Sequence, residues 1–150
     1  MGKDLFFLEK AYEEALKALN KDEVPVGAVI VKGGLIIGKG HNMRISENNP
    51  LLHAEISAIQ DASKTLNSWR LDGTTMYVTL EPCMMCVGAI MQSRIDRVVF
   101  GALDKKGGCV CSNLDINRLK LPFKIEYEYL EHEKSSQILK DFFKNKRKGK

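Results

Sequence analysis

The sequence predicts an α/β protein in which helices cover a central β-sheet. Apolar residues recur at helical spacing in three segments, at residues 4–20, 54–66 and 132–147. Short apolar runs of strand length separate these segments, and glycine, asparagine or proline stands at most of the boundaries. Because 150 residues suit one domain, we expect residues 1–150 to form a single one.

The first predicted elements are a helix and a β-hairpin. Residues 4–20 place leucine, alanine and tyrosine on one helical face. The helix should end before Pro25, because proline disfavours helical backbone in the residue that precedes it. Residues 26–31 and 35–37 are apolar and flank Gly33-Gly34, which is typical of two antiparallel strands joined by a tight turn.

Helices and strands then alternate through the middle of the chain. Residues 54–66 predict a second helix, with His53 in or just before its first turn. Residues 76–80 predict a buried strand. A third helix over residues 82–93 begins with a proline, whose missing N–H costs little in a first turn. Residues 98–101 predict a further strand.

The last third of the chain predicts a loop, a strand and a basic helix. Residues 102–113 are polar and contain glycine, so we expect a loop there. In residues 125–130 apolar and acidic side chains alternate, which indicates a strand. Residues 132–147 carry an apolar stripe typical of an amphipathic helix.

Hydropathy and the N-terminal residues lead us to expect neither a membrane-spanning nor a secreted protein. No apolar run approaches the roughly 20 residues of a membrane span, and the N-terminus has no signal-peptide pattern, so we expect a cytoplasmic protein. The net charge of the chain is +4. Residues 140–150, the basic end of the last helix, have a net charge of +5, and the rest of the chain has a net charge of −1. This basic segment is suited to phosphate, although a solvated helix end explains it equally well.

Three candidate zinc ligands lie in two separate motifs. Cys83 and Cys86 stand three residues apart, and neighbours at this spacing on a helical turn have Cβ atoms about 5–6 Å apart. His53 begins a different helix, and helix N-termini can converge at one edge of an α/β sheet. A structural zinc usually has four protein ligands, whereas a catalytic zinc keeps one position open for water. Three ligands therefore indicate hydrolytic chemistry, although a lone C-x-x-C also fits a redox pair.

Glu55 is the candidate proton carrier of this site. It lies two residues beyond His53 and does not share a helix face with it, so it is poorly placed as a ligand. It can instead take a proton from the attacking water and return it to the substrate. We interpret Cys109 and Cys111 as packing cysteines, with a fourth ligand or a second metal as the alternative, because no second close pair accompanies them.

The chain resembles the bacterial tRNA-specific adenosine deaminases over nearly its whole length. The H-x-E…P-C-x-x-C pattern is the signature of zinc-dependent deaminases of the cytidine deaminase-like fold. The segments that narrow the resemblance to this one family are residues 23–28, 41–42, 71–73, 77–86, 93–95, 97–101, 106–108 and 142–143.

The resemblance implies a fold, an activity and a set of roles. It implies a three-layer α/β/α sandwich on a mixed five-stranded sheet, forming a homodimer with active sites near the dimer interface. It implies hydrolysis of adenosine to inosine at the wobble position of a tRNA anticodon, with release of ammonia. It also implies that His53, Cys83 and Cys86 bind one zinc ion per subunit, that Glu55 is catalytic, and that Asn42 binds the target nucleoside.

Two of the predicted substrate contacts have alternatives. Asn42 also fits a local turn cap. Asp104 is a candidate acceptor for a ribose 2′-hydroxyl, which would favour RNA over DNA, or else a solvated loop charge. Pro122-Phe123 departs from the family pattern and bears on the RNA-contacting loops more than on the chemistry. The rival functions are a deaminase of the same fold that acts on a free base or a nucleotide, such as a guanine or cytosine deaminase, and a catalytically silent RNA-binding module.

Overall fold

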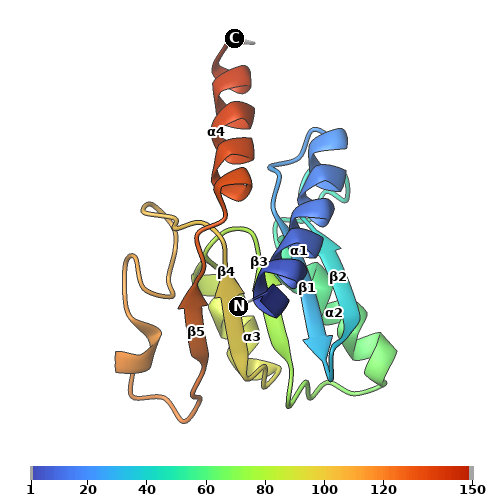
Figure 1. Cartoon of the computed structure of the whole chain (residues 1–150), viewed down its shortest axis with the longest axis vertical. Coiled ribbons are helices and arrows are strands. Elements are labelled where there is room, and N and C mark those ends of the chain that lie inside the picture. The colour runs from blue at the N-terminus through green and yellow to red at the C-terminus, as the bar shows by residue number, and fades with distance from the viewer. Residues whose placement is uncertain (1, 149–150) are drawn as a thin grey trace.

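The computed structural model describes residues 2–148, which build one mixed five-stranded sheet in the order β2-β1-β3-β4-β5 (Figure 1). Strand β1 (Gly27–Lys32) pairs antiparallel with both β2 (Leu35–His41) and β3 (Thr75–Val78). Strands β4 (Arg97–Phe100) and β5 (Glu126–Tyr129) continue the sheet parallel to β3. The prediction of a mixed five-stranded sheet is therefore confirmed.

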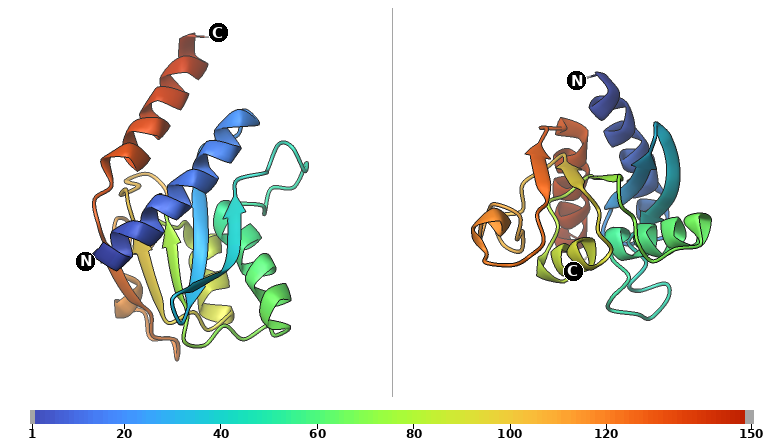
Figure 2. Two further views of the ribbon diagram at one scale, coloured as in Figure 1. Left: turned by 45° about the vertical axis from the view of Figure 1, so that its right-hand side comes forward. Right: turned by 90° about the horizontal axis from the view of Figure 1, so that it is seen from below.

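Helices cover both faces of the sheet, which confirms the three layers (Figure 2). Helix α1 (Gly2–Asn20) covers one face, and α2 (Ala54–Leu66) and α3 (Met84–Gln92) cover the other. Helix α4 (Glu133–Lys148) extends beyond the end of the sheet (Figure 1). A short 3₁₀ helix, η1 (Ile116–Arg118), lies in a stretch where the sequence predicted no element. No helix within residues 2–148 is both long and apolar enough to cross a bilayer.

The two cores follow from the alternation of side chains along the strands. On β1, Ala28 and Ile30 join the apolar cluster that includes residues of α2 and α3. Val29 and Val31 alternate with these residues along the strand and point to the opposite face, where they join a second cluster with Leu8 of α1. Fully burying a valine or isoleucine side chain contributes about 1.5–3 kcal/mol to the stability of the fold. The side chains on both faces of β1 therefore help to hold the helices against the sheet.

Helix α2 is fixed by glycines on the neighbouring strand. A Cβ atom added to Gly40 of β2 would lie 2.4 Å from the carbonyl oxygen of Ala54 and 2.4 Å from the amide nitrogen of Ala58. Gly38, two residues earlier on the same face, meets the next turn of α2 in the same way. The strand and helix backbones can approach this closely only because these residues have no side chain. The N-terminus of α2 is thereby held against the end of β2.

Strand β3 is shorter than the predicted 76–80, because it ends at Val78. The Thr79 hydroxyl accepts a hydrogen bond from the Gly27 N–H at 3.1 Å, and the Glu81 N–H donates to the Ala102 carbonyl at 2.9 Å. These bonds turn the chain out of the sheet and toward α3. Cys83 is consequently the N-cap of α3, with extended backbone, and does not lie in the first helical turn as predicted.

Candidate active site

His53, Cys83 and Cys86 meet where α2 and α3 begin. His53 is the N-cap of α2, and its Nδ1 atom lies 3.6 Å from the Sγ atoms of both cysteines. All three ligand atoms lie within 4.8 Å of one another. A tetrahedral zinc with Zn–S bonds of about 2.3 Å and a Zn–N bond of about 2.0–2.1 Å separates nitrogen from sulfur by about 3.6 Å. The predicted convergence is confirmed, and the donors and their spacing fit a zinc ion.

The electrostatics of the cluster also favour a cation. The thiol of Cys86 donates toward the Cys83 sulfur, and this bond, with a further one to His53, lowers the pKa of Cys83 to about 3. The Cys83 thiolate and burial raise the pKa of Cys86 above its ordinary value. These shifts favour a negative charge on the half-buried Cys83 sulfur and a proton on the buried Cys86 thiol. A divalent ion would neutralise the second thiolate.

Glu55 is a buried acid in the first turn of α2. Its side chain is 4% exposed, and burial raises its pKa to about 7, with the Cys83 thiolate adding to the shift. A carboxyl group with a pKa near neutrality can accept and return a proton at the pH of the cell. The environment of Glu55 suits the predicted proton transfer, and its catalytic role stays a prediction.

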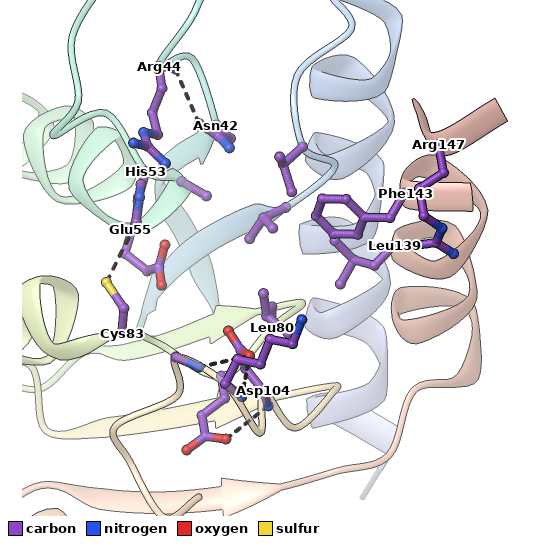
Figure 3. A pocket seen from close by; sticks show the side chains of 16 residues that line it. Asn42, Arg44, His53, Glu55, Leu80, Cys83, Asp104, Leu139, Phe143 and Arg147 are labelled. Carbon is purple, nitrogen blue, oxygen red and sulfur yellow. Dashed lines mark hydrogen bonds between the residues drawn. The ribbon is translucent and has the colours of Figure 1, made fainter. Parts of the chain in front are cut away.

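A cavity of about 690 Å³ opens over this cluster (Figure 3). Its volume lies within the roughly 300–1,000 Å³ typical of small-molecule sites. Five of the six predicted site residues line it, namely Asn42, His53, Glu55, Cys83 and Asp104. The sixth, Cys86, is fully buried.

Asn42 and Asp104 face the cavity while capping their own loops. Asn42 Oδ1 accepts a hydrogen bond from the Arg44 N–H at 3.2 Å, which is the local turn foreseen as its alternative. Asp104 Oδ1 accepts from the N–H groups of Lys106 and Gly107 at 3.2 and 3.1 Å. Each side chain keeps a further polar atom, the Asn42 amide nitrogen and Asp104 Oδ2. Their contacts to substrate stay predictions.

The cavity also has lining residues that sequence reasoning missed. Figure 3 shows Leu139, Phe143 and Arg147 of α4 on the side of the pocket opposite His53. These three are spaced by four residues and so share one helix face. Their shared face can be read from the sequence, but nothing in the sequence places that face beside the cavity. No comparable signal marks Arg44, whose position depends on a loop conformation.

The remaining motifs lie outside the metal cluster. Cys109 and Cys111 pack on the core of the α2 and α3 face and do not belong to the group that could hold a metal among residues 2–148. Phe123, the departure from the family pattern, lies beneath the Arg94 guanidinium at 4.7 Å and does not line the cavity. Gly149 and Lys150, the last residues of the basic segment, lie outside the described residues.

Comparison with known proteins gives a consistent assignment. The family model for MafB19-like deaminases matches residues 3–147. The chain is 44% identical to the tRNA-specific adenosine deaminase of Bacillus subtilis, over 100% of this chain and 94% of that protein. A structure from a study of A-to-I editing by tRNA:A34 deaminases at the wobble position of transfer RNA is 39% identical, covers 90% of this chain and 99% of its own, and has a TM-score of 0.82.

A guanine deaminase from Bacillus subtilis is a more distant neighbour. It is 29% identical, covers 93% of this chain and 92% of its own, and has a TM-score of 0.65. The fold is thus shared with deaminases of free bases, whereas the higher identities and the higher TM-score fall on the tRNA-specific group. The chain belongs to the tRNA-specific adenosine deaminase family.

Proposed function

We propose that this protein hydrolyses adenosine to inosine at the wobble position of a tRNA anticodon, releasing ammonia and using one zinc ion per subunit. One observation carries the proposal. The three candidate ligands and the buried acid Glu55 lie at one cavity whose lining also includes basic side chains. We infer that residues 1–150 act as one deaminase domain, because the described residues build a single sheet and the site lies at one end of it.

The chemistry divides between the metal and Glu55. Zinc, when bound, lowers the pKa of water to about 7 and so supplies a nucleophile for the amine-bearing ring carbon. Glu55 takes the proton from that water and delivers it to a ring nitrogen. It then takes the second proton from the hydroxyl group that has added to the ring carbon and passes it to the departing amine, so that water and adenosine yield inosine and ammonia. The buried position of Glu55 supports this role, because a desolvated carboxylate binds a proton more readily.

The cavity lining supports an RNA substrate. Arg44, Lys106 and Arg147 contribute positive charge from three separate segments and are suited to phosphates on either side of the target base. Phe143 is 45% exposed, and an exposed aromatic ring can stack on an unpaired base of an anticodon loop. Asp104 would accept a hydrogen bond from a ribose 2′-hydroxyl, which favours RNA over DNA.

We also propose a homodimer in the cytoplasm. Leu51 and Met84, which neighbour the ligand segments, are 56% and 68% exposed. A contiguous patch of exposed apolar side chains marks an interaction surface, and we infer that these two residues contribute to one. A reducing compartment would keep the cysteine ligands available for metal. Light scattering of the purified protein gives the oligomeric state directly, and a Met84→Glu variant should shift it toward monomer.

The function is tested with an anticodon stem-loop that carries a wobble adenine. Sequencing after incubation detects the product, because inosine is read as guanine. Guanine, cytosine and deoxycytidylate in parallel reactions test the free-base and nucleotide alternatives. We expect turnover of the stem-loop alone, and turnover of guanine or cytosine alone would replace the proposal.

A Glu55→Ala variant separates an enzyme from a silent RNA-binding module. The variant should keep its zinc, measured by elemental analysis, and should lose ammonia release by about 10²–10⁴-fold, the usual contribution of a positioned acid–base group. A variant that retains wild-type turnover would remove Glu55 from the mechanism.

A further inference from the structure

Two glutamates that the proposed chemistry does not use are almost completely buried. Glu23 is 1% exposed and Glu81 is 2% exposed. Neither forms an ion pair with any residue in the described range 2–148. Burial of a carboxylate is costly unless hydrogen bonds compensate for lost water, so the partners of these two groups show what each one holds in place.

All hydrogen bonds accepted by Glu81 come from the loop at residues 102–113. Its Oε2 atom accepts from the backbone N–H groups of Val110, Cys111 and Ser112 at 3.0, 2.9 and 2.9 Å. Its Oε1 atom accepts from the Asp104 N–H at 3.1 Å and from the Ser112 hydroxyl. One carboxylate thus gathers both ends of the loop that brings Asp104 and Lys106 to the cavity.

Glu81 also ties this loop to the metal cluster, because it stands two residues before Cys83. The Cys109 N–H donates to the Pro82 carbonyl at 2.8 Å, which adds a backbone contact between loop and cluster. A Cβ atom at Gly108 would lie 2.4 Å from Glu81 Cδ, so the loop passes this closely only because residue 108 is glycine. The separation between Asp104 and the metal ligands is therefore fixed through Glu81.

Glu23 makes the equivalent contacts on the other side of the cavity. Its carboxylate accepts from the backbone N–H groups of Ile45 and Ser46 at 3.1 and 2.6 Å. These residues follow Arg44, and Figure 3 shows Arg44 and Asp104 on opposite sides of the metal-binding residues. Two loops that face each other across the site are thus each held by one buried carboxylate.

We propose that Glu23 and Glu81 are positioning residues that set the width of the RNA-binding cleft by fixing these two loops. The inference rests on the proposed function, since it assigns the loops to RNA. Neither glutamate touches the reacting atoms. Each acts through the backbone of a loop whose side chains contact the substrate.

The Glu81→Gln variant tests this with little change in volume. The new amide group can donate to the Ser112 hydroxyl, so it should occupy the place of Oε1. The three N–H groups on the other oxygen then keep their acceptor, whereas the Asp104 N–H loses its own. The loss of a hydrogen bond to a charged group can change the affinity for the stem-loop roughly tenfold. We therefore expect KM for the stem-loop to rise about tenfold in Glu81→Gln, while kcat stays within about threefold of the wild-type value.

The direction of the change in KM distinguishes a displaced loop from a simple loss of charge. Removing a negative charge near an RNA site should by itself tighten binding. Weaker binding by Glu81→Gln therefore reports a displaced loop. Glu47→Gln is the matched control, because Glu47 is exposed and lies in the loop that Glu23 holds. It removes the same charge without a buried contact, and its KM should equal or fall below that of the wild type.

Amide hydrogen exchange gives a readout that does not need turnover. Exchange at Asp104 should accelerate in Glu81→Gln, and exchange at Ile45 and Ser46 should accelerate in Glu23→Gln, while zinc content stays at one per chain. Unchanged KM and unchanged exchange in both variants would overturn the inference, as would a loss of kcat that only follows a loss of zinc. Should Glu81→Gln fail to fold, Glu23→Gln carries the same test on the facing loop. A wild-type protein that leaves the stem-loop unmodified refutes the proposed function instead.

Discussion

Gly40 lies outside the cavity lining, yet its substitution should impair catalysis. An alanine Cβ at this position would lie 2.4 Å from the Ala54 carbonyl oxygen and from the Ala58 amide nitrogen. Ordinary contacts of this kind begin at 3.4 Å, so α2 must move away by about 1 Å. Helix α2 carries His53 and Glu55 at its N-terminus. A misplacement of about 1 Å can cost about 10²-fold in rate, so we expect kcat of Gly40→Ala to fall by that order.

Single-turnover deamination of the stem-loop, under zinc saturation, measures this effect. Gly88→Ala is the control, because a Cβ there meets no atom within 4 Å, and alanine is favoured over glycine inside a helix. It should keep the wild-type rate. A folded Gly40→Ala protein with wild-type kcat would refute the view that close backbone contact positions the catalytic helix.

Metal removal, acid and truncation each give a separate expectation. Chelation should lower the melting temperature in calorimetry, because two thiols and a carboxyl group are then left crowded without a cation, and an unchanged value would contradict a shared metal site. Hydrogen bonds from Arg97 and from the Tyr77 hydroxyl lower the pKa of Asp4 from 3.8 to about 2, so these contacts together contribute about 2 kcal/mol above pH 3.8, and this stabilisation disappears as the pH falls through about 2. In urea unfolding, wild type and Asp4→Asn should therefore differ at pH 7 and converge near pH 2, and a constant difference would refute the assignment. Deleting residues 144–150 should weaken stem-loop binding and flatten its salt dependence by about one unit for each phosphate that these residues no longer neutralise, whereas an unchanged slope would leave them as solvated surface.

The fold was largely predictable because its elements carry strong local patterns. The helix over residues 4–20, the hairpin around Gly33-Gly34 and the helix that begins after His53 all match the structure closely. The end of β3 was missed, because its apolar pattern continues through Leu80 while a bond from the Gly27 N–H to the Thr79 side chain turns the chain away. A contact across 52 residues leaves no trace in a local pattern.

The candidate site also contains residues that local sequence patterns reveal and residues that only the tertiary structure reveals. The grouping of the three candidate ligands was predictable because zinc chemistry restricts the residue types and their spacing, and the two helix N-termini do converge. Glu23 and Glu81 were missed as anchors, because an isolated acid in the sequence does not reveal which loop amides will surround it. Phe143 and Arg147 reach the cavity only because α4 passes beside it, which is a tertiary relation.

X-ray absorption spectroscopy of the purified, active protein, combined with elemental analysis, tests the central claim most directly. We predict one zinc per chain, with two sulfur ligands at about 2.3 Å, one imidazole nitrogen at about 2.0–2.1 Å and one further light ligand from solvent. A third sulfur, which would have to come from Cys109 or Cys111, or active protein without zinc, would contradict the account.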